Sequence, residues 1–137
     1  MSGRRILVVD DEPRILDIVR YYLEQGGYAV EGCTSGEEAL AAARTAPFDL
    51  AVLDIILEKA SGYEVAGRLK KIPGMETAPV LFMSSKVEMA ELFLESYDGR
   101  AEFLLKPFKK DALLEAVRSL FEGGGRQARK ARRARGS

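Results

Sequence analysis

The sequence contains no histidine, no tryptophan and only one cysteine among its 137 residues. A single cysteine excludes an intramolecular disulfide. Together with the absence of histidine, it also excludes a zinc site built from nitrogen and sulfur ligands. Without histidine the chain has no imidazole base, no Ser-His-Asp or Cys-His nucleophile and no phosphohistidine of its own. Hydrolases and zinc enzymes of these types are therefore excluded.

Long hydrophobic runs are also missing. The apolar run nearest the N-terminus, Ile6 to Val9, has four residues before Asp10, which is too short for a signal peptide or a membrane span. A length of 137 residues fits one domain with a core of its own. We therefore expect one cytoplasmic domain with no membrane segment.

The net charge of zero, from 21 basic and 21 acidic residues, is an average over two unlike parts. Six basic residues and no acidic ones lie between Arg126 and Arg135. The other 15 basic and 21 acidic residues give positions 1–125 a net charge of −6. We expect an acidic domain at 1–122, followed at 123–137 by a basic tail that begins with a glycine hinge and is disordered.

Short apolar, β-branched runs alternate with amphipathic segments. Strands are predicted at 5–9, 28–33, 50–53, 80–83 and 103–105. Helices are predicted from Pro13 to Gly26, from a capping box at Ser35 and Glu38 to Pro47, and at 63–71, 87–97 and 109–122. Such alternation predicts an α/β fold with a parallel sheet, and a barrel would need about 250 residues. We expect a flavodoxin-like, doubly wound, five-stranded sheet in the order 2-1-3-4-5 with five helices.

In such a sheet, ligands bind beyond the carboxyl ends of the strands. Asp10, Asp11 and Glu12 follow the first predicted strand, and Asp54 directly follows the neighbouring third one. The first three acids could merely cap a helix. Asp54, however, interrupts the apolar run 50–57, where a solvated cap is a poor explanation. Converging carboxylates need a cation, and oxygen ligands favour Mg²⁺.

Ser84 and Lys106 directly follow the fourth and fifth predicted strands. Taken singly, each is an ordinary turn or surface residue. At the same edge of the sheet, however, they join the carboxylates. A carboxylate, a bound cation, a lysine and a hydroxyl are the groups needed to form and hold an aspartyl phosphate.

Five motifs of the sequence resemble the receiver domain of bacterial two-component response regulators. They are Val8 to Pro13, Leu53 to Ile55, Gly62, Met83 to Ser85 and Phe103 to Phe108. They occur in the family's order and spacing across residues 4–122, with eight residues from Asp54 to Gly62 and 22 from Ser84 to Lys106. Within this family the chain resembles the stand-alone, chemotaxis-type single-domain regulators.

The resemblance implies a phosphorylation site at Asp54, which would accept a phosphoryl group from a sensor histidine kinase. Lys106, joined to Pro107 by a bond that is usually cis in the family, and Ser84 match the catalytic lysine and hydroxyl. Ser84 and Phe103 match the switch residues, although Phe103 could also be a core residue. The implied Mg²⁺ ligands are Asp10 through water, Asp11, Asp54 and the backbone carbonyl of Ile56.

The implied partners are the kinase and either a downstream effector or a histidine phosphotransfer protein. Three residues depart from the family pattern. Glu58 replaces a usual proline, Ser85 replaces a small residue, and the aliphatic Ile56 stands beside the acceptor. Because an aliphatic side chain cannot orient an attacking water molecule, we expect slow autodephosphorylation.

Other functions are less well supported by the sequence. A flavodoxin-type electron carrier would bind a flavin phosphate in the first loop, where the three acids would repel it. A phosphatase of the aspartyl-phosphate type needs a second aspartate at the position of Ile56, so we expect no enzyme beyond self-phosphorylation and slow dephosphorylation. Nucleic-acid association through the basic tail remains the alternative. However, no aromatic residues lie among the basic residues of the tail, and no helix-turn-helix or other DNA-binding motif follows in the sequence.

Overall fold

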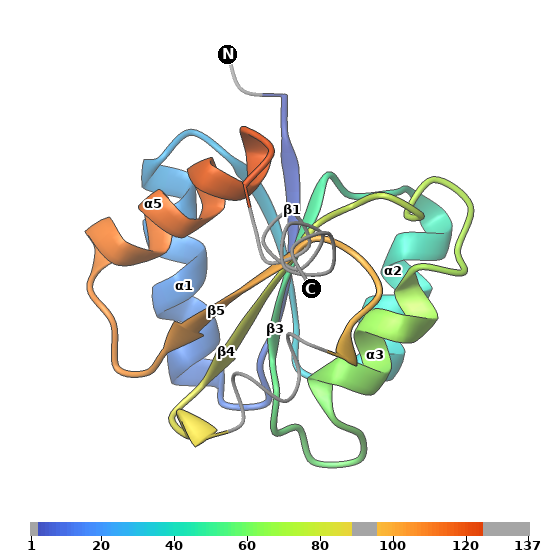
Figure 1. The fold of residues 1–137 in the computed structure, drawn as a ribbon, viewed down its shortest axis with the longest axis horizontal. Helices are drawn as coiled ribbons and strands as arrows, with labels where there is room; N and C mark the ends of the chain where they lie inside the picture. The colour runs from blue at the N-terminus through green and yellow to red at the C-terminus, as the bar shows by residue number, and fades with distance from the viewer. Residues whose placement is uncertain (1–2, 89–95, 125–137) are drawn as a thin grey trace, which may run out of the picture.

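The computed structural model describes residues 3–88 and 96–124. One sheet of five parallel strands has the order β2-β1-β3-β4-β5 (Figure 1). The strands are β1 (Arg5–Val9), β2 (Ala29–Cys33), β3 (Leu50–Asp54), β4 (Val80–Ser84) and β5 (Ala101–Leu105). This confirms the predicted doubly wound sheet and its strand order. Strand β5 begins two residues earlier than predicted.

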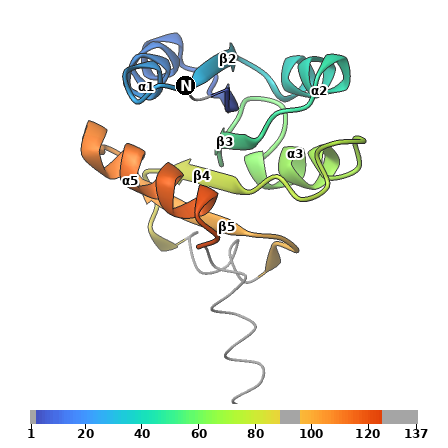
Figure 2. The ribbon, with the colours of Figure 1, turned by 90° about the horizontal axis from the view of Figure 1, so that it is seen from above.

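Helices cover both faces of the sheet. They are α1 (Pro13–Gln25), α2 (Gly36–Thr45), α3 (Gly62–Leu69) and α5 (Lys110–Phe121). Helices α1 and α5 lie on one face and α2 and α3 on the other (Figure 2). The helix predicted at 87–97 falls mostly on residues 89–95, outside the described residues. The predicted tail lies outside them too, except for its first two glycines, so both remain predictions.

The core forms two layers because side chains alternate along the strands. Ile6 and Val8 of β1 pack toward α1 and α5, whereas Leu7 and Val9 pack toward α2 and α3. Strands β3 and β4 are buried at every position, as expected for parallel strands covered on both faces. Among the described residues, no helix has the length and apolar character needed to cross a bilayer.

The helix ends follow the local signals in the sequence. Helix α1 starts at Pro13, and the chain leaves it through Gly27, whose φ of +96° favours glycine. At α2 the Glu38 N–H donates to Ser35 Oγ at 3.2 Å. The Glu38 carboxylate accepts from the Thr34 N–H at 2.8 Å. The predicted capping box is thus present in a modified form. The Glu38 carboxylate accepts from the Thr34 N–H, whereas in the usual motif it would accept from the N–H of Ser35.

Candidate functional site

Asp10 directly follows β1 and is fully buried, with an exposed fraction of 0%. Its backbone N–H donates to the Cys33 carbonyl at 3.1 Å. Its Oδ1 accepts a hydrogen bond from the Glu12 N–H at 2.9 Å. The turn between β1 and α1 therefore fixes the Asp10 carboxylate at the carboxyl edge of the sheet. Asp11, the next residue, is partly exposed.

Asp54 is the last residue of β3, and only 6% of its surface is exposed. Its Oδ1 accepts from the Ile56 N–H at 3.2 Å. Because β1 and β3 are neighbours, Asp54 lies beside Asp10. One carboxylate oxygen of each of Asp10, Asp11 and Asp54 lies within 4.8 Å of the other two. The structure thus brings together three of the four acids that the sequence predicted to converge. Glu12 is exposed and does not belong to this cluster.

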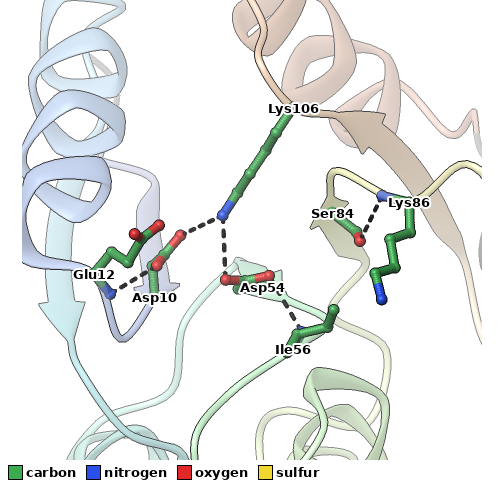
Figure 3. A network of polar contacts seen from close by, with 7 residues as sticks. All are labelled: Asp10, Glu12, Asp54, Ile56, Ser84, Lys86 and Lys106. Atoms are coloured by element: carbon green, nitrogen blue, oxygen red, sulfur yellow. Dashed lines mark hydrogen bonds and ion pairs between the residues drawn. The ribbon is translucent and has the colours of Figure 1, made fainter.

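Lys106 follows β5 and reaches across the edge to both buried acids (Figure 3). Its Nζ donates to Asp10 Oδ2 at 3.0 Å and to Asp54 Oδ2 at 3.2 Å. The Lys106 N–H donates to the Ser84 carbonyl at 2.8 Å, which ties the residue to the end of β4. The bond between Lys106 and Pro107 is cis, as the family resemblance implied.

The charges of this cluster do not balance among its side chains. Burial raises the pKa of Asp54, Lys106 opposes that shift and Asp10 adds to it. Burial acts to lower the pKa of Lys106, but the hydrogen bond to Asp10 and the charges of Asp54 and Asp10 outweigh it, so that pKa is raised. One lysine therefore faces three carboxylates, and oxygen donors with excess negative charge suit a divalent cation such as Mg²⁺.

Ser84 ends β4 and is 1% exposed. Its Oγ accepts from the Lys86 N–H at 3.1 Å, so the hydroxyl is held at the same edge as the acids (Figure 3). Phe103 lies on β5, is half-buried, and packs against the core layer formed with α2 and α3. Packing in this layer agrees with the core interpretation of Phe103, and its role as a switch remains a prediction.

Backbone donors complete the site in ways that sequence reasoning missed. The N–H groups of Glu12, Ile56 and Lys86 orient the side chains of Asp10, Asp54 and Ser84 respectively. No side-chain signal could have revealed them, because any residue except proline supplies such a donor. The carbonyl of Ile56, predicted as a metal ligand, remains a prediction.

The fold and this acidic edge together define a CheY-like α/β domain. The chain belongs to the response regulator receiver domain family, whose model matches residues 6–118. It is thus a receiver domain of two-component response regulators, a signalling domain. These comparisons favour this interpretation over nucleic-acid association through the basic tail.

Several known proteins are similar to this chain. The alkaline phosphatase synthesis transcriptional regulatory protein PhoP of Bacillus subtilis is 37% identical over 118 residues, covering 86% of this chain and 48% of PhoP. The chain therefore spans about half the length of the curated relatives it matches. Chemotaxis protein CheY4 of Vibrio cholerae is 26% identical with a TM-score of 0.74, covering 85% of this chain and 98% of CheY4.

A further solved structure bears on the metal. Response regulator protein TrrA of Thermotoga maritima, described as a complex with Mg(2+)-BeF, is 34% identical and has a TM-score of 0.74. The match covers 85% of this chain and 98% of TrrA. The acidic cluster of the present chain is consistent with binding of a divalent cation.

Proposed function

We propose that Asp54 accepts a phosphoryl group from the phosphohistidine of a sensor histidine kinase. An Asp54 carboxylate oxygen attacks phosphorus, the phosphorus–nitrogen bond breaks, and its electron pair returns to the imidazole ring of the kinase. The observation that carries this proposal is the pair of hydrogen bonds from Lys106 Nζ to Asp10 at 3.0 Å and Asp54 at 3.2 Å. This arrangement holds a buried nucleophile next to a fixed positive charge.

The remaining site residues have roles in this transfer. Asp10, Asp11, Asp54 and the Ile56 carbonyl would hold Mg²⁺, which when bound supplies positive charge for the phosphoryl oxygens. Lys106 neutralises another phosphoryl oxygen. The Ser84 hydroxyl, now an acceptor for the Lys86 N–H at 3.1 Å, turns to donate to the phosphoryl group. Phe103 moves inward as Ser84 moves, and this alters the face around β5.

We propose that this altered face is recognised by a downstream effector, or that the phosphoryl group passes on to a histidine phosphotransfer protein. We also propose that the domain acts in the cytoplasm, where the kinase would take its phosphoryl group from ATP. Beyond promoting its own phosphorylation and slow dephosphorylation, the domain catalyses nothing. The aliphatic Ile56 side chain, which is 50% exposed beside the acceptor, does not orient a hydrolytic water molecule.

The test uses histidine kinases of the source organism, each first labelled with radioactive ATP. The kinase that labels this chain fastest is then offered the wild-type protein and Asp54→Asn. We expect label in the wild type only, and dependence on Mg²⁺ that EDTA abolishes. Normal labelling of Asp54→Asn would refute the assignment. The rate of phosphoryl loss tests Ile56: faster loss in Ile56→Ala with no change in Ile56→Asn would contradict the orientation argument.

A further inference from the structure

A groove of about 380 Å³ lies between the N-terminal end of α2 and the loop that joins β3 to α3. Its floor is apolar. Leu40 of α2, Leu57 of the loop and Val65 of α3 line it, and their exposed fractions are 6%, 9% and 2%. Asp11 also lines the groove. The groove is therefore continuous with the edge that carries the acidic cluster.

The rim of this groove is acidic. Glu37, Glu58 and Glu64 are exposed and line it with Asp11, so four carboxylates stand against two cations, Lys59 and Arg68. Across residues 3–88 and 96–124, none of the three glutamate carboxylates takes part in a hydrogen bond or ion pair. The rim therefore keeps a net negative charge, an excess of two carboxylates with Asp11 and of one when Asp11 is taken as a Mg²⁺ ligand.

The groove lies next to the surface that a phosphoryl-donor protein must cover to reach Asp54. Asp54 is only 6% exposed, so a protein that brings a phosphohistidine to it must lie closely over the carboxyl edge of the sheet. That surface includes Asp11, from which the groove continues. The groove therefore lies at the border of the surface that a phosphoryl-donor protein covers, whereas a small phosphoryl donor would not reach across it.

We infer that this groove binds a lysine or arginine side chain of the phosphoryl-donor protein. Such a side chain would lay its aliphatic stem on Leu40, Leu57 and Val65 and bring its charge to the glutamates of the rim. The inference rests on the proposed function and names a determinant of donor specificity.

The experiment compares two phosphoryl donors on one variant, Glu37→Gln with Glu58→Gln and Glu64→Gln. One donor is the histidine kinase that labels the wild type fastest, and the other is acetyl phosphate. We expect kcat/KM with the kinase to fall about fivefold, mainly through KM, and to depend less on salt. Labelling by acetyl phosphate, an anion, should stay equal or become faster because fewer negative charges repel it.

The matched control removes three charges elsewhere, with Glu24→Gln, Glu76→Gln and Glu122→Gln. These exposed residues line neither the groove nor the acidic cluster, so both donors should label this variant as they label the wild type. An unchanged rate with the kinase in the groove variant would overturn the inference, and so would an equal loss with both donors. If no histidine kinase of the source organism labels wild-type Asp54, the proposed function is refuted instead, whatever the result with acetyl phosphate.

Discussion

Gly62 lies where the chain passes back over the end of β3, and its N–H donates to the Ile55 carbonyl at 2.7 Å. A Cβ at this position would overlap the backbone of Asp54, with the Asp54 carbonyl carbon at 2.8 Å. The close approach explains physically why a glycine stands eight residues after the candidate phosphoryl acceptor. No larger residue lets the loop pack against the acceptor's own backbone.

We predict that Gly62→Ala lowers the free energy of unfolding by about 2–4 kcal/mol, because backbone must shift to relieve the overlap. Gly67→Ala is the matched control. Gly67 lies inside α3 and a Cβ there meets no atom within 4 Å, so alanine should stabilise the protein by roughly 0.5–1 kcal/mol. Urea denaturation measures both. Equal effects of the two substitutions would contradict the steric explanation.

Cys33 is buried at the end of β2, and burial raises the pKa of its thiol from 9.0 to about 11, with smaller contributions from Glu38 and Glu31. The folded thiol holds its proton more tightly than the unfolded one. Its contribution to stability is therefore complete below pH 9 and is lost as the pH rises toward 11. We predict that ionisation of Cys33 lowers the unfolding free energy of the wild type by on the order of 2 kcal/mol between these pH values, and that Cys33→Ala does not show this decrease.

The measurement is the difference in unfolding free energy between wild type and Cys33→Ala at several pH values from 7 to 11. Both proteins contain the buried Tyr97, whose pKa is also raised, mainly by burial. Taking the difference cancels the effect of Tyr97 on stability. A difference that does not vary with pH would contradict the raised pKa of the Cys33 thiol. The same burial should make Cys33 of the folded protein react slowly with thiol reagents near neutral pH.

At the scale of the elements, the capping box of α2 contributes to the free energy of unfolding by an amount that can be measured. Replacing Ser35 with alanine removes the acceptor of the Glu38 N–H at 3.2 Å, and we predict a loss of about 1 kcal/mol. Ser35→Asp restores an acceptor and should keep stability near the wild-type value. Thermal unfolding of the three proteins tests this. Equal stability of the alanine and aspartate variants would show that the cap contributes nothing.

Element ends were predictable where a residue dictates the backbone. Pro13 starts α1, Ser35 caps α2, and Gly27 takes the positive φ that follows α1. The start of β5 was missed because Ala101 and Glu102 are not β-branched and so give no strand signal in the sequence. They belong to the strand only because they pair with β4. Helix α3 likewise begins at Gly62 because Ser61 caps it, a signal weaker than the apolar pattern that follows.

At the scale of the whole molecule, the three clustered carboxylates should couple metal binding to folding. A cation that binds only the folded state raises its stability by mass action. We predict that millimolar Mg²⁺ raises the Tm of the wild type, and that Asp11→Asn, which removes one candidate ligand, abolishes most of this rise. Glu24→Gln, an equal change of charge away from the cluster, should respond to Mg²⁺ as the wild type does.

The meeting of Asp10, Asp54 and Lys106 was predictable from the sequence because parallel strands end at one edge of the sheet. The groove beside Asp11 was not, because its shape depends on how α2 packs against the loop after β3. Sequence patterns identify which residues lie on an edge. Only the packed structure shows that a groove with an acidic rim lies beside that edge.

Lys106 joins residues far apart along the chain, since Asp54 lies 52 positions before it and Asp10 lies 96. Both contacts require β1, β3, β4 and β5 to be in place, and contacts at such separation close large loops of chain. The acceptor edge is therefore completed only when the last strand docks. A nascent or partly unfolded chain would lack the lysine beside Asp54. If Asp54 accepts the phosphoryl group as proposed, its phosphorylation would therefore require the folded domain.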